Sequence, residues 1–277
     1  MNRSLRISVI IVTWNGDPLL EACLESLHRV YGTELEIVVV DNANLELTRR
    51  LSSAFANVKY VAAPENLGFA GGNNLGLAFC TREYILLLNN DTVVHDDSFS
   101  PLAQFLDEHR KVGIVQGTMI IPGFGFDDCG VQMTPFGIQR HLHRGESDCG
   151  RLHPRRVTAA KGAMMMIRRK AVDDCGFLFY DHFKSYFEET DFCRRATNHG
   201  WEVWFVPTPP IDHLCGATSS KFARDDVWRQ YFRNILYSFA RNWGFWGRFV
   251  MLPSFAFAAF CLSPRNLISA VGSLRRE

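Results

Sequence analysis

Between Tyr84 and Val94 the chain reads YILLLNNDTVV, an apolar run that ends abruptly in three polar residues. The unbroken apolar stretch Tyr84–Leu88 is typical of a buried strand in a parallel sheet. Asn89, Asn90 and Asp91 then come at the edge of that sheet, where ligands bind in open α/β folds. Their oxygens also suit a hard divalent cation such as Mg²⁺. The alternative interpretation is a turn, because Asn-Asn-Asp is also favourable turn sequence.

Similar apolar runs alternate with helical patterns along the chain. Strands are predicted at Leu5–Thr13, Glu36–Val40, Val58–Ala62, Tyr84–Leu88, Gly113–Gln116, Ala163–Arg168 and Val203–Val206. Helices are predicted at Asp17–Tyr31, Thr48–Ala56, Gly71–Cys80, Ser100–His109 and Glu188–Asn198. This alternation implies right-handed crossovers and a mostly parallel central sheet flanked by helices, so the fold class is α/β. The Gly-, His- and Arg-rich stretch from Ile121 to Arg156 is interpreted as a variable loop region with room for short strands.

Other predicted strands also end in polar residues, and parallel strands place these at one edge. Thr13, Trp14 and Asn15 follow the first strand, and Asp41 closes the second. The Asp41 carboxylate could accept an N–H from a uracil, thymine or guanine base, or bind ribose hydroxyls. It could equally be the aspartate of a turn or helix cap.

A glycine-rich segment, Asn66–Asn74, opens the third predicted helix and includes Gly68 and Asn73. Accessible backbone at a helix N-terminus favours binding of a diphosphate. The segment is neither a Walker loop nor G-x-G-x-x-G. The alternative is that it only packs closely beneath a nucleotide.

Three carboxylates, Glu188, Glu189 and Asp191, lie within four residues at a predicted helix start. Acidic residues there are also favoured by the helix dipole, which is the structural interpretation. Flanking aromatic residues predict partial burial, and burial beside other carboxylates should raise the pKa of a carboxyl group. A carboxylate with a raised pKa suits a general base.

His213 precedes a loop of small residues that extends to Ser220. A lone histidine is most often structural or solvated. The loop after it could close over a phosphate group.

The composition limits the class of protein. Of the 277 residues 47% are hydrophobic and 21% are charged, which supports a packed core and not a disordered chain. Eight cysteines occur without a C-x-x-C pair, and no secretory signal precedes them, so free thiols in a reducing cytosol are expected. A zinc site is not expected without paired spacing.

The order of these motifs resembles the inverting family 2 glycosyltransferases, in particular their rhamnosyltransferase- and galactofuranosyltransferase-like branch. The resemblance rests on Ser8–Asn15, Val39–Asn42, Asn66–Asn74, Leu87–Asp91, Lys161–Ala163, Tyr186–Ala196, Gly200–Trp201 and His213–Ser219. It covers about residues 5–235. It implies a GT-A fold, assigned to residues 1–225. From Asp225 onwards dense aromatic residues predict long helices, so residues 226–277 are assigned to a C-terminal helical extension.

The resemblance also implies roles for the candidate residues. Thr13, Trp14, Asn15, Asp41, Asn66, Gly68, Asn73, Asn89, Asn90 and Asp91 would bind the nucleotide-sugar. Asn89 stands where the family has the first aspartate of its Asp-x-Asp motif, so Asp91 would be the main carboxylate ligand of Mg²⁺ or Mn²⁺. His213 matches the family histidine that completes the metal shell. Glu189 matches the catalytic base, in a place where many relatives have aspartate, so Glu188 and Asp191 stay open as alternatives.

The implied reaction is a single in-line displacement at the anomeric carbon. A hexosyl residue, for example rhamnosyl, would pass from a dTDP-, UDP- or GDP-linked donor to a polysaccharide or lipid-linked oligosaccharide. The donor sugar, its base, the acceptor and the linkage are not predicted.

The C-terminal part of the chain is aromatic and basic. Residues 221–277 contain nine basic and three acidic residues, and the first 220 residues are mildly acidic. The run Phe249–Leu262 is too short to span a bilayer comfortably and contains Pro253. An interfacial helix is therefore expected, on a cytoplasmic protein at the inner face of the membrane. Packing against the core or against a second subunit is the alternative, which leaves a homo-oligomer open.

Three other functions have less support from the sequence. A non-catalytic nucleotide-sugar-binding or scaffold protein would share the fold and is supported only by the Asn89 and Glu189 departures. A nucleotidyltransferase needs a Gly-rich, basic loop after the first strand, and Thr13–Asp17 does not supply one. Nucleic-acid binding is disfavoured by the acidic body of the chain.

Overall fold

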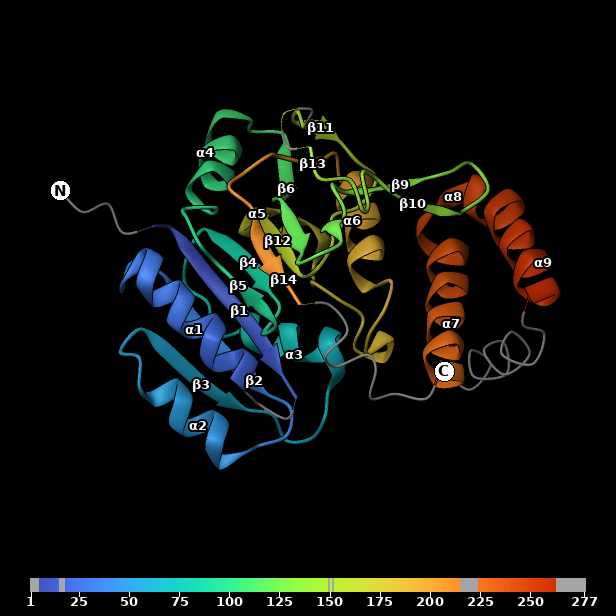
Figure 1. Cartoon of the computed structure of the whole chain (residues 1–277). Coiled ribbons are helices and arrows are strands. Elements are labelled where there is room, and N and C mark those ends of the chain that lie inside the picture. Colours follow the sequence, from blue (N-terminus) through green and yellow to red (C-terminus); the bar gives the residue numbers. More distant parts are fainter. Residues whose placement is uncertain (1–4, 15–17, 149, 151, 215–223, 263–277) are drawn as a thin grey trace.

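The computed structural model describes residues 5–14, 18–148, 150, 152–214 and 224–262, and it is centred on an eight-stranded sheet (Figure 1). The strand order is β11-β13-β6-β12-β4-β1-β2-β3. Four parallel strands form one half of the sheet: β1 (Ile7–Thr13), β2 (Glu36–Asp41), β3 (Val58–Ala62) and β4 (Tyr84–Leu88). The helices between them are α1 (Pro18–Tyr31), α2 (Glu46–Ser53) and α3 (Gly68–Leu77). This alternation confirms the predicted α/β class.

The second half of the sheet contains strands of both directions. Helix α4 (Ser100–Glu108) leads to β6 (Val112–Gln116), and α6 (Glu188–Asn198) leads to β13 (Glu202–Phe205), which is parallel to β6. Between β4 and β6 lies β12 (Met164–Arg168), antiparallel to both and followed by α5 (Arg169–Cys175). The edge strand β11 (Arg155–Arg156) is antiparallel to β13. The sheet is therefore mostly parallel, as predicted, with two reversed strands.

The region predicted as a variable loop contains several short strands. Strands β7 (Met119–Ile121) and β8 (Gly125–Phe126) join β5 (Thr92–Val93) and β14 (Ile211–His213) in a four-stranded sheet of order β5-β14-β7-β8. Strands β9 (Val131–Met133) and β10 (Gln139–His141) form a hairpin. The small sheet matters for function because it ties the end of β14 to the segment after β4.

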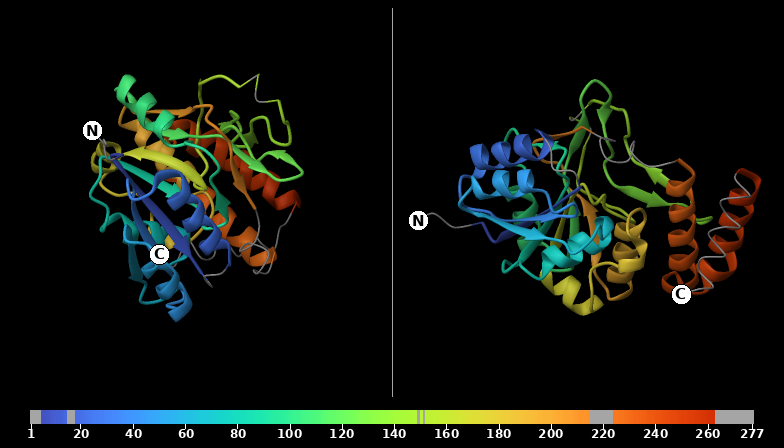
Figure 2. Two further views of the ribbon diagram at one scale, coloured as in Figure 1. Left: turned by 60° about the vertical axis from the view of Figure 1, so that its left-hand side comes forward. Right: turned by 90° about the horizontal axis from the view of Figure 1, so that it is seen from below.

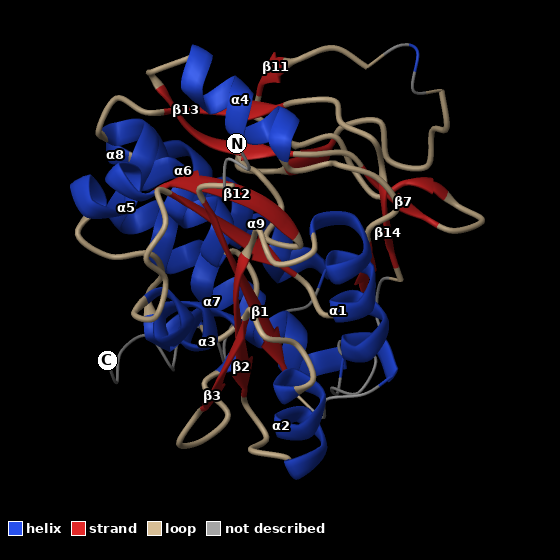
Figure 3. Cartoon of the chain, turned by 90° about the vertical axis from the view of Figure 1, so that its left-hand side faces the viewer, coloured by secondary structure: helices blue, strands red, loops and turns tan. Residues whose placement is uncertain are grey.

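Both faces of the large sheet are buried, which explains the continuous apolar runs. Alternate residues of a strand point to opposite faces, so Ile10 packs in one core with α3, α5 and α6, whereas Val9 and Ile11 pack in another with α1 and α4. Figure 3 shows α1 and α2 on one side of β1–β3 and α3 on the other.

The C-terminal helices form a group whose first member, α7, packs beside α6 (Figure 2). They are α7 (Arg224–Asn242), the short α8 (Gly244–Trp246), the π-helical turn η4 (Gly247–Met251) and α9 (Leu252–Leu262). A small core of Phe187, Ile235, Phe239, Trp243 and Met251 joins them to the segment before α6. The helical character predicted for the C-terminal part is thus confirmed within residues 224–262, and residues 263–277 lie outside the described residues. Within the described residues, none of the helices combines the length and apolar character needed to cross a membrane.

Candidate functional site

A cavity of about 430 Å³ opens where β1 and β4 end and α6 begins. It is lined by Val12, Trp14, Asn42, Asn66, Phe69, Asn89, Asn90, Asp91, Lys161, Gly162, Ala163, Ser185, Tyr186, Glu188, Glu189 and His213. Carboxyl ends of parallel strands and a helix N-terminus therefore meet at one site, as in open α/β folds generally.

The segment after β4 contributes three polar side chains to this cavity. The Asn90 amide Nδ2 donates a hydrogen bond to Thr13 Oγ1 at 3.1 Å, which links the ends of β4 and β1. The Asn89 amide Nδ2 lies 3.2 Å from His213 Nε2. Asp91 is buried, and its Oδ1 has no hydrogen-bond partner among the described residues.

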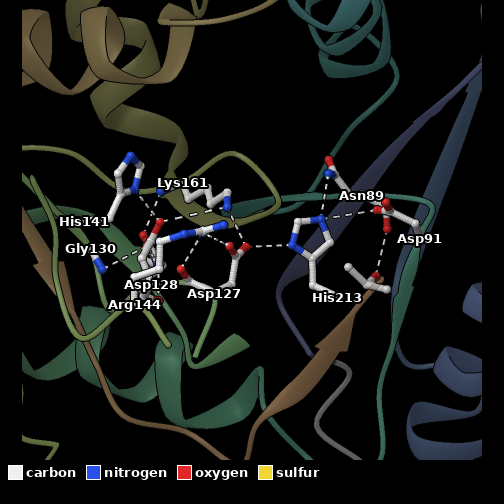
Figure 4. Close-up of polar contacts among 11 residues, drawn as sticks. Asn89, Asp91, Asp127, Asp128, Gly130, His141, Arg144, Lys161 and His213 are labelled. Carbon is white, nitrogen blue, oxygen red and sulfur yellow. Dashed lines mark hydrogen bonds and ion pairs between the residues drawn. The ribbon is translucent and has the colours of Figure 1, made fainter. Parts of the chain in front are cut away.

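His213 reaches Asp91 because of the small sheet. β14 pairs antiparallel with β5, which puts His213 opposite Thr92. Its Nδ1 lies 2.7 Å from Asp127 Oδ2 (Figure 4). A carboxylate only accepts hydrogen bonds, so this contact assigns the ring proton to Nδ1 and leaves a lone pair on Nε2 in the neutral imidazole.

Two acceptor atoms consequently face each other. His213 Nε2 and Asp91 Oδ1 are 3.3 Å apart, at ion-pair distance but without hydrogen-bond geometry. A cation with both atoms as ligands would satisfy Asp91 Oδ1 and would replace the Asn89 amide donor at Nε2. A carboxylate on the other ring nitrogen is the usual partner of a metal-binding histidine. The residues therefore fit a divalent metal whose remaining ligands come from substrate phosphates. No cluster of three or more His, Cys, Asp or Glu suited to a metal occurs in the described part of the chain.

Asp127 and Asp128 form a buried charged network behind His213 (Figure 4). Asp127 accepts from Lys161 Nζ at 2.5 Å and from Arg144 Nη1 at 2.7 Å, besides His213. Burial alone would raise the pKa of Asp127, but the hydrogen bond from His213 and the charge of Lys161 lower it well below its ordinary value. This carboxylate therefore stays ionised and orients the imidazole.

Asp128 accepts from Gln116 Nε2 at 2.8 Å and lies 2.9 Å from His141 Nδ1. Sequence reasoning missed Asp127 and Asp128 because they fall in the predicted loop region. The signal available was two adjacent carboxylates between apolar residues. Lys161 is part of the motifs that carry the family resemblance but was not predicted as a site residue. It lines the cavity and pairs with both Asp127 and Asp128.

Glu188 and Glu189 reach the cavity from the first turn of α6. Their Oε2 atoms are buried and have no hydrogen-bond partner among the described residues. Burial raises the pKa of both carboxyl groups, and the charge of Glu189 raises that of Glu188 further. Lys161 acts in the opposite direction on Glu189. These two side chains have the setting expected of a general base.

The third candidate base, Asp191, does not lie beside Glu188 and Glu189 at the cavity. Its carboxylate accepts from Arg195 Nε at 2.9 Å and from Asn242 Nδ2 at 2.7 Å, and it does not line the cavity. These contacts tie α6 to the end of α7. The structure thus brings two of the three candidate bases together at the cavity.

The ends of β1 and β2 contribute unequally. Trp14 lines the cavity, and Asn15 lies outside the described residues. Asp41 is fully buried and accepts from the backbone N–H groups of Ala43 (2.9 Å) and Leu45 (2.7 Å). The carboxylate thus occupies a turn, the alternative noted from the sequence, and the neighbouring Asn42 lines the cavity instead.

The polar groups of the glycine-rich segment are used mainly in contacts within the protein. Asn66 lines the cavity, but its Oδ1 accepts from the Gly68 N–H at 2.9 Å. Gly68 has φ +71°, and a Cβ there would lie 2.6 Å from the carbonyl oxygen of Lys184. Asn73 is buried and donates to the Phe69 carbonyl at 2.9 Å. The segment therefore lets α3 approach the chain that leads into α6.

Comparison with known proteins identifies the family. Residues 8–176, more than half of the chain, match Glycosyl transferase family 2. The chain belongs to this family. The low-salt glycan biosynthesis hexosyltransferase Agl10 of Haloferax volcanii is 27% identical over 198 residues, a match covering 69% of this chain and 61% of that protein. The chain thus spans less than two thirds of that curated relative.

Solved structures of glycosyltransferases share the fold. GalNAc-T7 with UDP, GalNAc and Mn²⁺ superposes with a TM-score of 0.65 at 18% identity, covering 85% of this chain and 48% of that one. The mannosyltransferase PcManGT from Pyrobaculum calidifontis, in complex with GDP-Man and Mn²⁺, gives 0.59 at 18% identity, covering 98% and 74%. These likenesses confirm the predicted GT-A fold for this family 2 member. They do not distinguish the rhamnosyltransferase- and galactofuranosyltransferase-like branch.

Proposed function

We propose that this family 2 member is a metal-dependent inverting glycosyltransferase that moves a hexosyl residue from a nucleotide-diphospho-sugar to a hydroxyl group of a glycan or lipid-linked glycan. The observation that carries the proposal is the shared cavity. Asp91 Oδ1, which has no hydrogen-bond partner among the described residues, faces His213 Nε2 there, and Glu188 and Glu189 line the same cavity with unpartnered carboxylate oxygens. One end would suit a diphosphate with its metal, and the other would suit an acceptor hydroxyl.

Asp91 Oδ1 and His213 Nε2 would hold Mg²⁺ or Mn²⁺, with the Asn89 side-chain oxygen as a further candidate. When bound, the cation would neutralise the negative charge of the departing nucleoside diphosphate. Asp127 keeps the imidazole in the tautomer that offers Nε2 to this position. Solved relatives of the same fold are described with a nucleotide or nucleotide-sugar and Mn²⁺, which supports this choice.

Glu189 would act as the base. Its carboxylate would take the proton of the acceptor hydroxyl as the acceptor oxygen bonds to the anomeric carbon and the bond to the diphosphate breaks. Attack from the face opposite the leaving group would invert the anomeric configuration. Its raised pKa makes the carboxylate a stronger base than an exposed glutamate while Lys161 limits the shift.

The proposal is tested by screening UDP-, dTDP- and GDP-sugars for thermal stabilisation with and without Mn²⁺, because a ligand that binds only the folded state raises its stability. Asp91→Asn should abolish the Mn²⁺-dependent part of the shift. Asp96→Asn, an exposed carboxylate five residues further on, should leave it intact.

Transfer to a glycan acceptor, or hydrolysis of the stabilising donor, would establish catalysis. Donor binding without turnover under any metal would favour the non-catalytic binding protein instead. Equal stabilisation of the wild type and Asp91→Asn by donor with Mn²⁺ would contradict the metal site.

We further propose that the C-terminal helices contact the inner face of the cell membrane, where a lipid-linked acceptor would lie. Five large aromatic side chains on α8, η4 and α9 are exposed: Phe245, Trp246, Phe249, Phe257 and Phe260. Exposed aromatic residues beside basic ones are typical of interfacial helices, and Arg248 lies among them.

The wild-type protein should float with anionic liposomes. The variant in which Phe245, Phe249 and Phe257 are replaced by serine should not. Unchanged flotation, or none by the wild type, would favour packing on a partner subunit.

A further inference from the structure

The chain enters α6 through an unusual backbone conformation. Lys184, Tyr186 and Phe187 all have positive φ values, of 55°, 72° and 73°. Bulky residues rarely adopt this region, and such strain persists only where surrounding contacts hold the backbone in place. The entry segment, residues 182–187, directly precedes the two carboxylates that line the cavity.

Helix α7 supplies most of these contacts. The Asn234 side chain is fully buried, and its Nδ2 lies within donating distance of three carbonyls of the entry segment, those of Phe183 (3.0 Å), Ser185 (3.0 Å) and Tyr186 (2.7 Å). One turn earlier, Gln230 Nε2 donates to the Phe183 and Ser185 carbonyls at 2.6 and 3.1 Å. The side-chain amides of Asn234 and Gln230 thus donate hydrogen bonds to backbone carbonyls of the entry segment that have no partner in a helix or a sheet.

Three further hydrogen bonds hold the same region. From α3, the Ala70 N–H donates to the Lys184 carbonyl at 2.7 Å. From α7, the Tyr231 hydroxyl donates to Gln139 Oε1 at 2.9 Å, and Gln139 Nε2 donates to Thr190 Oγ1 at 2.8 Å. The first turn of α6 is therefore fixed from the cavity side and from the C-terminal helices.

We propose that Asn234, assisted by Gln230, is a positioning residue that holds the start of α6 so that Glu188 and Glu189 face the reacting atoms. This inference rests on the function proposed above. It assigns the C-terminal helices a part in catalysis, although α7 contributes no residue to the cavity lining. Misplacing a reacting group by about 1 Å costs on the order of 100-fold in rate.

A purely structural role would lower stability without changing how the base titrates, so the pH–rate profile separates the two roles. The groups that act on the two carboxylates are Lys161, His141 and Asp128 from the cavity side, Tyr186 from the entry segment and Tyr231 from α7. Releasing the entry segment would hydrate Glu188 and Glu189. The acid limb of the profile should then move to lower pH.

The test compares Asn234→Leu, which removes the donor at similar volume, with Ser238→Ala. Ser238 lies one turn further along α7, is equally buried and bonds Trp243 Nε1 instead of the entry segment. Asn234→Leu should lower kcat on the order of 100-fold, change the donor KM little and shift the acid limb. Ser238→Ala should do none of these. If Asn234→Leu does not fold, Gln230→Leu should give the same changes at smaller size.

Unchanged kcat and pH profile in a folded Asn234→Leu protein would overturn the inference, as would equal losses in Ser238→Ala. A wild-type protein that transfers and hydrolyses no donor would instead overturn the proposed function itself. The two failures are therefore distinguishable.

Discussion

Glu188 is buried and Glu189 is half-buried, the charge of Glu189 raises the pKa of Glu188, and each has a buried Oε2 without a hydrogen-bond partner among the described residues. Such a pair is costly for folding and is typical of sites where groups are kept ready for chemistry. Asp191, three residues after Glu188, shows the contrast. It is as buried as Glu188, but its carboxylate accepts hydrogen bonds from Arg195 and Asn242.

Replacing Glu189 by glutamine should lower kcat about 10²–10⁴-fold, the usual contribution of a general base. Donor binding, measured by thermal shift, should be retained because the Asp91 and His213 end of the cavity is untouched. The wild-type rate should fall as pH drops through the raised pKa, because the base must be deprotonated. Glu188→Gln is the matched control, and full activity of Glu189→Gln with loss in Glu188→Gln would reverse the assignment.

Glu188 should also make stability depend on pH. Its pKa is raised in the folded state, so its contribution to stability is present below the ordinary carboxyl pKa and is lost as pH rises through the raised value. Glu188→Gln does not titrate. The Tm of Glu188→Gln minus the Tm of the wild type should therefore increase by a few degrees as the pH is raised from 4.5 to 8. A difference independent of pH would mean that Glu188 titrates normally.

At the scale of elements, the site depends on close approach between segments distant in sequence. β14 must pair with β5 to bring His213 beside Asp91, and α3 must meet the entry segment to support α6. Gly68 permits the second contact because it has no Cβ and tolerates a positive φ.

Gly68→Ala should therefore destabilise the protein more than Gly32→Ala does. Both glycines have positive φ (71° and 56°), so both variants incur the left-handed penalty of about 1 kcal/mol. Only at Gly68 does the new Cβ meet backbone, the Lys184 carbonyl, whereas nothing lies within 4 Å at Gly32. The clash should cost about 1–3 kcal/mol more, measured by urea unfolding. Equal losses would indicate that the approach of α3 is loose.

At the scale of the whole molecule, the C-terminal helices are joined to the rest of the protein by a shared core and by contacts to α6 and its entry segment. The predicted boundary between residues 225 and 226 marks a change of composition, and α7 begins two residues before it. The division into two domains remains a prediction.

A fragment of residues 1–223 should consequently unfold at lower temperature and lose activity, because it exposes Phe187 and leaves the entry-segment carbonyls without their donors. A fragment of residues 1–262 keeps all these contacts and is the control. Thermal unfolding and donor turnover measure both effects. A fully stable, active fragment 1–223 would show that the extension is separable.

Much of this arrangement was predictable from local patterns. Apolar runs such as Tyr84–Leu88 are long enough to specify buried strands, and the polar residues after them, Asn89 to Asp91, fall at the cavity because parallel strands share an edge. The region from Ile121 to Arg156 was predicted to have room for short strands, but their positions were not predicted, since two- and three-residue strands have too few positions for a periodic pattern.

Burial and chain direction follow from patterns that lie within a few residues of one another. The amino-acid sequence was therefore sufficient for the α/β class and the family, and for choosing Asp91, His213 and Glu189 as candidates. Which carboxylates face the cavity was settled by packing. The Asp41 carboxylate accepts backbone hydrogen bonds within a turn, and the Asp191 carboxylate accepts from Arg195. Asp127 contacts His213 from a region of the sequence without a recognisable pattern. These outcomes depend on contacts between residues far apart in the chain, which arise only when the fold has formed.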